Sequence, residues 1–158
     1  MAHIFQINIS SGGVPKLAAP LAQAHVTTNG IVGDKQRHLD VHGGPERAVC
    51  LYSLERILAL QQEGHPVFPG AMGENITLSG LDWSQLSPGM RLRLGEEVEL
   101  EITRPTTPCT NLRPYFLDGD YSRVSPNKHP GWSRFYARVL RAGKIVTGDR
   151  VEIVATEP

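Results

Sequence analysis

The sequence has few cysteines, few aromatic residues, no excess of charge of either sign and no long hydrophobic run. Two cysteines among 158 residues are too few for the disulfide framework of a small secreted domain. The 16 basic and 16 acidic residues give zero net charge, so no global charge recruits nucleic acid or a membrane surface. No apolar run approaches the roughly 20 residues that cross a bilayer. We therefore expect neither nucleic-acid nor membrane partners.

The N-terminal residues MAHIFQINIS lack the basic start and the long apolar stretch of a signal peptide. Together with the scarcity of cysteine, this predicts a soluble protein in the reducing cytoplasm. A chain of 158 residues is long enough for one domain with a core and short for two. We expect a single domain over residues 1–158.

Short strands dominate the predicted secondary structure, because 16 glycines and 12 prolines separate brief apolar runs. Apolar residues alternate with charged ones in residues 90–94 and 98–102, which predicts a hairpin across Gly95, and residues 143–153 have a similar form. Asn29-Gly30 predicts another hairpin. One clear helix is expected, from a Ser53 cap to about Gly64. A mainly β fold closed into a barrel, with one or a few short helices, removes exposed strand edges economically.

One cysteine lies in the proline-rich stretch ITRPTTPCTNLRP, residues 102–114. Proline fixes φ and has no N–H, so we expect the strand to end at Ile102 and the loop to display Cys109. The positive charges of Arg104 and Arg113 favour a reactive or metal-ligating thiolate there. The alternative is a small buried residue, which is the interpretation we favour for Cys50 within the apolar run AVCLY.

Charge is distributed unevenly along the chain. Residues 1–103 hold 7 Lys and Arg against 11 Asp and Glu, whereas residues 104–150 hold 9 against 3. The basic segment that begins at the cysteine loop is either an ordinary solvated face or a cleft for an anionic small molecule.

Two glycine-rich stretches, residues 41–49 and 70–78, place polar groups beside backbone that a ligand can approach closely. His42 is a candidate ligand or proton carrier, or a turn residue with local hydrogen bonds. Glu74 and Asn75 are candidate ligand contacts, or residues that brace a turn. Phosphate-loop, dinucleotide-binding, nucleophile-elbow and HExxH patterns are absent, so thiol chemistry or metal ligation is favoured.

Five motifs in order resemble the MOSC domain family, which is named after the C-terminal domain of molybdenum cofactor sulfurases. They are GIVGDKQ (30–36), HGGPERAVCLYS (42–53), GAMGENITLSGL (70–81), PC (108–109) and ARVLRAGKIVTGD (137–149). The resemblance implies a pyruvate-kinase-like β-barrel that binds the molybdenum-molybdopterin cofactor, with Cys109 as the family's cysteine. Many members have an arginine where this chain has Thr106, a role that Arg104 could take.

The resemblance implies a set of site residues. Cys109 would ligate molybdenum, and the expected cofactor contacts are His42, Gly43, Arg47, Glu74, Asn75, Arg104, Asn111 and Arg113. One hypothesis is a molybdenum-dependent reductase of small N-hydroxylated molecules that takes electrons from a separate partner protein. A second is a sulfur carrier that holds a Cys109 persulfide from a sulfur donor for cofactor or metal–sulfur cluster assembly. A third is a cofactor carrier without catalysis.

Overall fold

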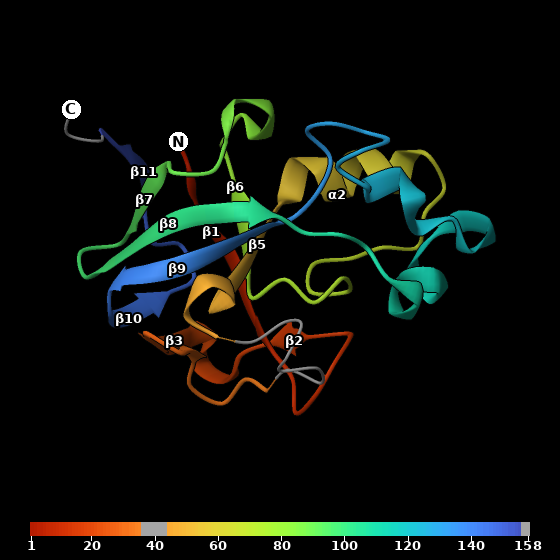
Figure 1. Ribbon diagram of the computed structural model, residues 1–158. Coiled ribbons are helices and arrows are strands. Elements are labelled where there is room, and N and C mark those ends of the chain that lie inside the picture. The colour runs from red at the N-terminus through yellow and green to blue at the C-terminus, as the bar shows by residue number, and fades with distance from the viewer. Residues whose placement is uncertain (36–43, 156–158) are drawn as a thin grey trace.

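The computed structural model describes residues 1–35 and 44–155, which form mostly short strands (Figure 1). The strands are β1 (His3–Ile9), β2 (Leu17–Ala18), β3 (Gln23–Thr27), β4 (Gly30–Ile31), β5 (Val49–Ser53), β6 (Ile76–Ser79), β7 (Arg91–Leu94), β8 (Val98–Pro105), β9 (Phe135–Arg141), β10 (Gly143–Val146) and β11 (Val151–Val154). The helices are α2 (Leu54–Gln62) and the 3₁₀ helices η1 (Pro20–Ala22), η2 (Pro45–Arg47), η3 (Trp83–Gln85), η4 (Thr110–Tyr115), η5 (Leu117–Gly119) and η6 (Tyr121–Val124). None of the helices in these two ranges is long and apolar enough to span a membrane.

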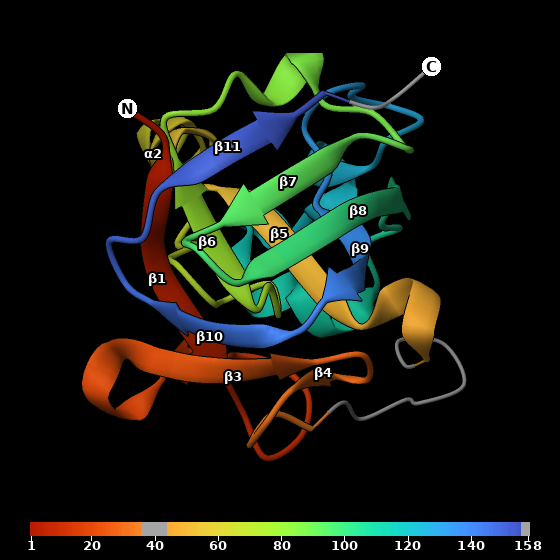
Figure 2. The ribbon, with the colours of Figure 1, turned by 90° about the vertical axis from the view of Figure 1, so that its left-hand side faces the viewer.

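Eight strands form one sheet in the order β11-β7-β8-β9-β5-β6-β1-β2. A second sheet, in the order β10-β3-β4, crosses below it in Figure 2. Neighbouring strands run antiparallel except for the parallel pair β5 and β6, which the helix α2 connects. The fold is therefore mainly β, as the sequence predicts.

The expected closed barrel is wrong, because the large sheet does not join its ends through a ladder. The segment before β11 meets β1 at one isolated bridge, between His3 and Arg150. Three backbone hydrogen bonds lie around that bridge: the Gly148 N–H donates to the Ile4 carbonyl, the Ile4 N–H to the Asp149 carbonyl and the Val151 N–H to the Ala2 carbonyl. This short contact does not extend into a ladder between β1 and β11, so the sheet is not closed into a barrel.

The local predictions from residue pattern are largely confirmed. In the β7–β8 hairpin Leu94 pairs with Val98, and the side chains that alternate with charged residues are buried. The β3–β4 hairpin forms around Asn29-Gly30. The Ser53 hydroxyl caps α2 by accepting the Arg56 N–H at 3.1 Å. Residues 143–153 do not form a hairpin of their own, because β10 pairs with β3 and β11 pairs with β7.

The strand β8 continues past its predicted end at Ile102. A register shift lies between Ile102 and Arg104, and Pro105 still pairs with Phe135 of β9. Beyond it, the Thr106 N–H donates to the Arg134 carbonyl at 3.0 Å. Proline removes only its own donor, so the ladder continues on the residues around it. The displayed loop is therefore shorter than the sequence suggests, and η4 to η6 follow it beyond the end of β8 (Figure 1).

Candidate functional site

The cysteine loop, residues 106–113, has its backbone fixed on both sides of the thiol. Thr106 is tied to Arg134 at the end of the β8–β9 ladder. On the other side, the Leu112 N–H donates to the Cys109 carbonyl at 3.0 Å as η4 begins. Cys109 is a free cysteine and is partly exposed, so this loop presents its thiol without sealing it in the core.

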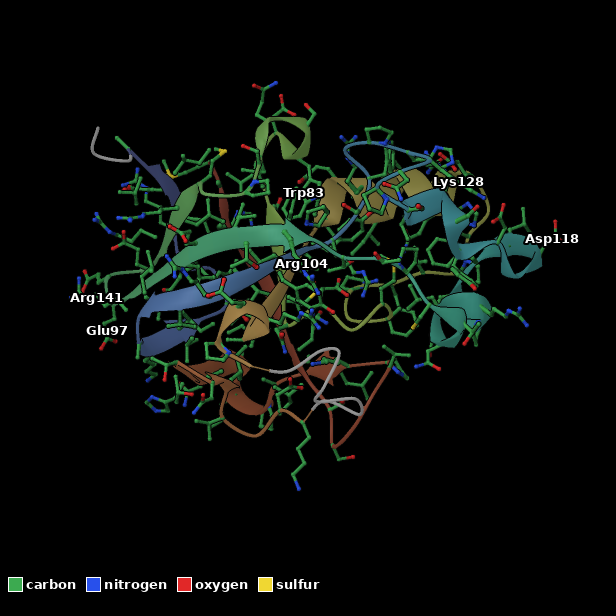
Figure 3. All side chains as sticks on the ribbon, viewed as in Figure 1. Trp83, Glu97, Arg104, Asp118, Lys128 and Arg141 are labelled. Atoms are coloured by element: carbon green, nitrogen blue, oxygen red, sulfur yellow. The ribbon has the colours of Figure 1, made fainter. Side chains whose placement is uncertain are left out.

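Two arginines flank one tyrosine beside this loop. The guanidinium carbons of Arg47 and Arg104 each lie 5.8 Å from the centre of the Tyr136 ring, within the range of a cation–π contact. Arg104 stands near the end of β8 (Figure 3) and Arg47 ends η2. Neither arginine has a carboxylate within ion-pair distance in the two described ranges. The pair thus offers positive charge to an anionic ligand.

Tyr136 is a neutral phenol at physiological pH. Burial raises its pKa to about 12, against the opposing influence of the neighbouring arginines. Tyr136 pairs with both Arg104 and Cys50 across the sheet, so β9 brings the arginine pair next to β5.

Ion pairs neutralise three of the nine basic residues in 104–150, namely Arg123, Arg138 and Arg150. Arg138 binds Glu101 at 2.7 Å and Arg123 binds Glu63 at 2.8 Å, so acidic residues of the first part of the chain neutralise basic residues of the second. The basic residues without an ion pair are the ones available to an anionic ligand. Arg104 and Arg113, on the two sides of Cys109, have no such partner among the residues described.

Asn75 braces the structure from a fully buried position. Its Oδ1 accepts the Cys50 N–H at 2.9 Å, and its Nδ2 donates to Asp34 Oδ2 at 2.9 Å. Asp34 also forms a 2.6 Å ion pair with Lys16, whose side chain is equally buried. These bonds fix the strand β5 against residues 10–34, and the role of Asn75 as a cofactor contact stays a prediction.

Glu74 is completely buried. Its Oε2 accepts the Thr77 hydroxyl at 3.1 Å, whereas its Oε1 has no hydrogen-bond partner in the described ranges. Burial raises the pKa of this carboxyl, while the Gly70 N–H and the Thr77 hydroxyl act in the opposite direction. A contact between Glu74 and a cofactor likewise stays a prediction.

The remaining predicted residues are distributed around the loop. Asn111 is partly buried and Arg113 is exposed, both in η4. His42 and Gly43 lie outside the described residues. Cys50 is 5% exposed, and burial raises its pKa to about 11, which confirms its interpretation as a core residue.

Arg134 is a site residue that sequence reasoning missed. It is 7% exposed, and its Nη1 donates to the Met72 carbonyl at 2.7 Å, so it links the start of β9 to the glycine-rich stretch 70–78. The pattern RFYARVL predicts a strand but does not distinguish a buried arginine from an exposed one. Tyr136, Lys16 and Asp34 were missed for the same reason, since their partners are distant in sequence.

No group of three or more His, Cys, Asp and Glu side chains that could hold a metal ion occurs within residues 1–35 and 44–155. Within the described ranges the cysteine loop therefore offers one soft donor, the partly exposed Cys109 thiol.

Comparison with known proteins identifies relatives. A model of the MOSC domain matches residues 38–152. YflK of Bacillus subtilis, itself called uncharacterized, is 34% identical over 124 residues, which cover 78% of this chain and 55% of YflK. Protein YiiM of Escherichia coli is 31% identical over 135 residues, which cover 82% of this chain and 58% of YiiM. A Gibberella moniliformis protein named Reductase is 29% identical over 133 residues, which cover 81% of this chain and 23% of that protein.

A solved structure of YiiM from Geobacillus stearothermophilus has the same fold. Its TM-score is 0.78 at 25% sequence identity, and the match covers 98% of this chain and 76% of that one. The chain spans a little more than half the length of YflK and of the Escherichia coli YiiM.

Proposed function

The chain belongs to the MOSC domain family, and on that premise we propose that it binds the molybdenum-molybdopterin cofactor with Cys109 as a ligand of the molybdenum. The observation that carries the proposal is the partly exposed thiol, fixed in a loop that Arg104 and Arg113 flank in sequence, with no carboxylate in the described ranges within ion-pair distance of either arginine. A soft thiolate suits molybdenum, and guanidinium groups suit a phosphate.

The protein's own residues would bind the cofactor and orient it. Arg47 and Arg104 hold the anionic part of the cofactor, and their stacking on Tyr136 limits how far either guanidinium can move. Arg113, exposed in η4 on the C-terminal side of Cys109, supplies a further positive charge. The neutral Tyr136 phenol leaves their positive charge available, because it carries no charge of its own at physiological pH.

When bound, the cofactor supplies the two-electron chemistry that removes oxygen from small N-hydroxylated molecules. A relative that is named Reductase supports this reaction class. The electrons come from a separate donor protein in the cytoplasm. The fixed backbone around Cys109 favours a metal ligand over a persulfide carrier, which benefits from a mobile arm.

Molybdenum and pterin content after expression in a cofactor-producing host tests the proposal. We expect near-stoichiometric amounts of both in the wild type. Cys109→Ser should lose most of its molybdenum, and the double variant Arg47→Gln/Arg104→Gln should lose pterin and molybdenum together. Cys50→Ala is the matched control, because it removes the other thiol. Equal molybdenum in wild type and Cys109→Ser would contradict the assignment of the ligand.

The sulfur-carrier alternative has a separate readout. After incubation with a cysteine desulfurase and cysteine, mass spectrometry of the Cys109 peptide would show the added mass of a sulfur atom if the protein were a carrier. We expect no persulfide above the level that is found in a Cys109→Ser preparation. If the protein binds the cofactor but reduces no substrate with any electron donor, its role would be that of a cofactor carrier.

A further inference from the structure

Four buried arginine nitrogens lack a hydrogen-bond partner in the described ranges, and one of them is unlike the others. Arg91, Arg123 and Arg138 each form an ion pair with a glutamate through their guanidinium groups. Arg134 has no carboxylate within ion-pair distance in the same ranges, and its Nε has no partner. The charge of Arg134 is therefore buried without a counter-ion there, and its Nη1 donates to the Met72 carbonyl.

Thr106 stands opposite Arg134. Pro105 pairs with Phe135, and the next residues along the antiparallel ladder, Thr106 and Arg134, are joined by a 3.0 Å backbone hydrogen bond. Residues directly opposite each other in such a ladder project from the same face of the sheet. The Thr106 hydroxyl is also buried and without a partner in the part of the chain that the structure describes. Two unsatisfied polar side chains thus lie side by side at the root of the cysteine loop.

Glu74 adds a third unsatisfied atom nearby. It follows two residues after Met72, which accepts the Arg134 hydrogen bond, and its Oε1 has no partner among the described residues. Burial is the largest influence on the Glu74 pKa and raises it, whereas the positive charge of Arg134 lowers it. The Glu74 carboxyl donates a hydrogen bond only in its protonated form, whereas the Arg134 guanidinium and the Thr106 hydroxyl are donors in any case.

Buried polar atoms in native proteins are almost always satisfied, and an unsatisfied group indicates a bound water or ion. Arg134 carries a positive charge, and its free Nε–H and the Thr106 hydroxyl can donate toward a shared acceptor. We propose that Arg134 and Thr106 form an inner anion site, near Glu74, that binds one small monovalent oxyanion. This site does not depend on the molybdenum cofactor.

The inner anion site lies next to the arginine pair. Arg104 and Thr106 are two residues apart in the β8 segment, as are Arg134 and Tyr136 in the β9 segment, so all four project from the same face. The exposed Arg104 would therefore meet an incoming anion first, and Arg134 lies one residue pair closer to the cysteine loop on the same face.

Nitrate titration of the full-length protein, purified without added cofactor, tests the proposal. The probe is the ¹⁵N spectrum of the arginine Nε–Hε groups, with the Arg134 signal assigned from Arg134→Lys. We expect this signal to shift and saturate with nitrate, and not with chloride at equal ionic strength. Thr106→Val should weaken nitrate binding about tenfold, because it removes a donor to a charged acceptor.

The control variant is Arg141→Gln. Arg141 ends β9 at the opposite end of the ladder from Arg104 (Figure 3), so nitrate binding should be unchanged. If Arg134→Lys does not fold, the signal is identified by its shift in Thr106→Val, which retains the threonine's shape and backbone N–H. A spectrum that responds equally to nitrate and chloride means that water fills the site and overturns the proposal. Undiminished nitrate binding by Thr106→Val overturns it too.

Discussion

Replacing the buried Glu74 with glutamine should make the protein's stability less sensitive to alkaline pH. The side chain is fully buried, and glutamine has nearly the same shape without the charge. The amide carbonyl of the introduced glutamine can still accept the Thr77 hydroxyl that now binds Glu74 Oε2. The comparison therefore isolates the cost of ionising a carboxyl in the core.

The sign follows from the direction of the pKa shift. Burial raises the pKa of Glu74 in the folded protein above its ordinary value of 4.5. Its contribution to stability is then fully present below that value and is lost as pH rises from 4.5 through the folded pKa. Glu74→Gln should gain stability relative to wild type over that interval, by up to about 1.4 kcal/mol for each pH unit.

Urea unfolding of both proteins between about pH 4 and pH 8 measures the effect. Glu63→Gln serves as the contrasting variant, because a hydrogen bond from Arg123 lowers the pKa of Glu63. That carboxylate stabilises the fold above its ordinary pKa of 4.5 and loses this effect only in acid below it, so Glu63→Gln should show no slope between about pH 5 and pH 8, where Glu74→Gln gains stability. A stability difference between wild type and Glu74→Gln that is constant with pH would refute the reasoning.

Two further predictions concern packing and thiol access. Gly70→Ala should unfold the protein or destabilise it severely, because the added Cβ would collide with the Lys16 carbonyl oxygen. Gly89 has a similar positive φ but open space around it, so Gly89→Ala should lower the thermal unfolding temperature much less. A thiol reagent should modify Cys109 rapidly in the native protein and Cys50 only after unfolding, since burial raises the Cys50 pKa to about 11. Rapid labelling of both thiols in the native state would contradict the burial of Cys50.

Local pattern was enough to predict the hairpins, the Ser53 cap and the family, because each depends on residues close together in sequence. The partial exposure of Cys109 could also be anticipated, from the prolines around it. The barrel prediction failed for the opposite reason. Whether the ends of a sheet join depends on contacts between distant segments, and here residues 148–151 meet the start of β1 through one bridge and three backbone hydrogen bonds without forming a ladder.

The buried polar residues were the least predictable part of the site. Glu74 and Asn75 attracted attention through the glycines around them, but the partners of Asn75, Asp34 and Cys50, come from other segments. Arg134 occupies a position in a strand-like run that gives no sign of burial. Its importance becomes visible only when Thr106 and Met72 are placed beside it in space.

X-ray absorption at the molybdenum edge tests the central claim most directly, because it counts the sulfur atoms around the metal. The comparison is between the cofactor-loaded wild type and the molybdenum that Cys109→Ser retains, with Cys50→Ala as the control. The account predicts that Cys109→Ser lacks one molybdenum–sulfur contact that the other two proteins have. The same sulfur coordination in all three would contradict the assignment of Cys109 as a ligand of molybdenum.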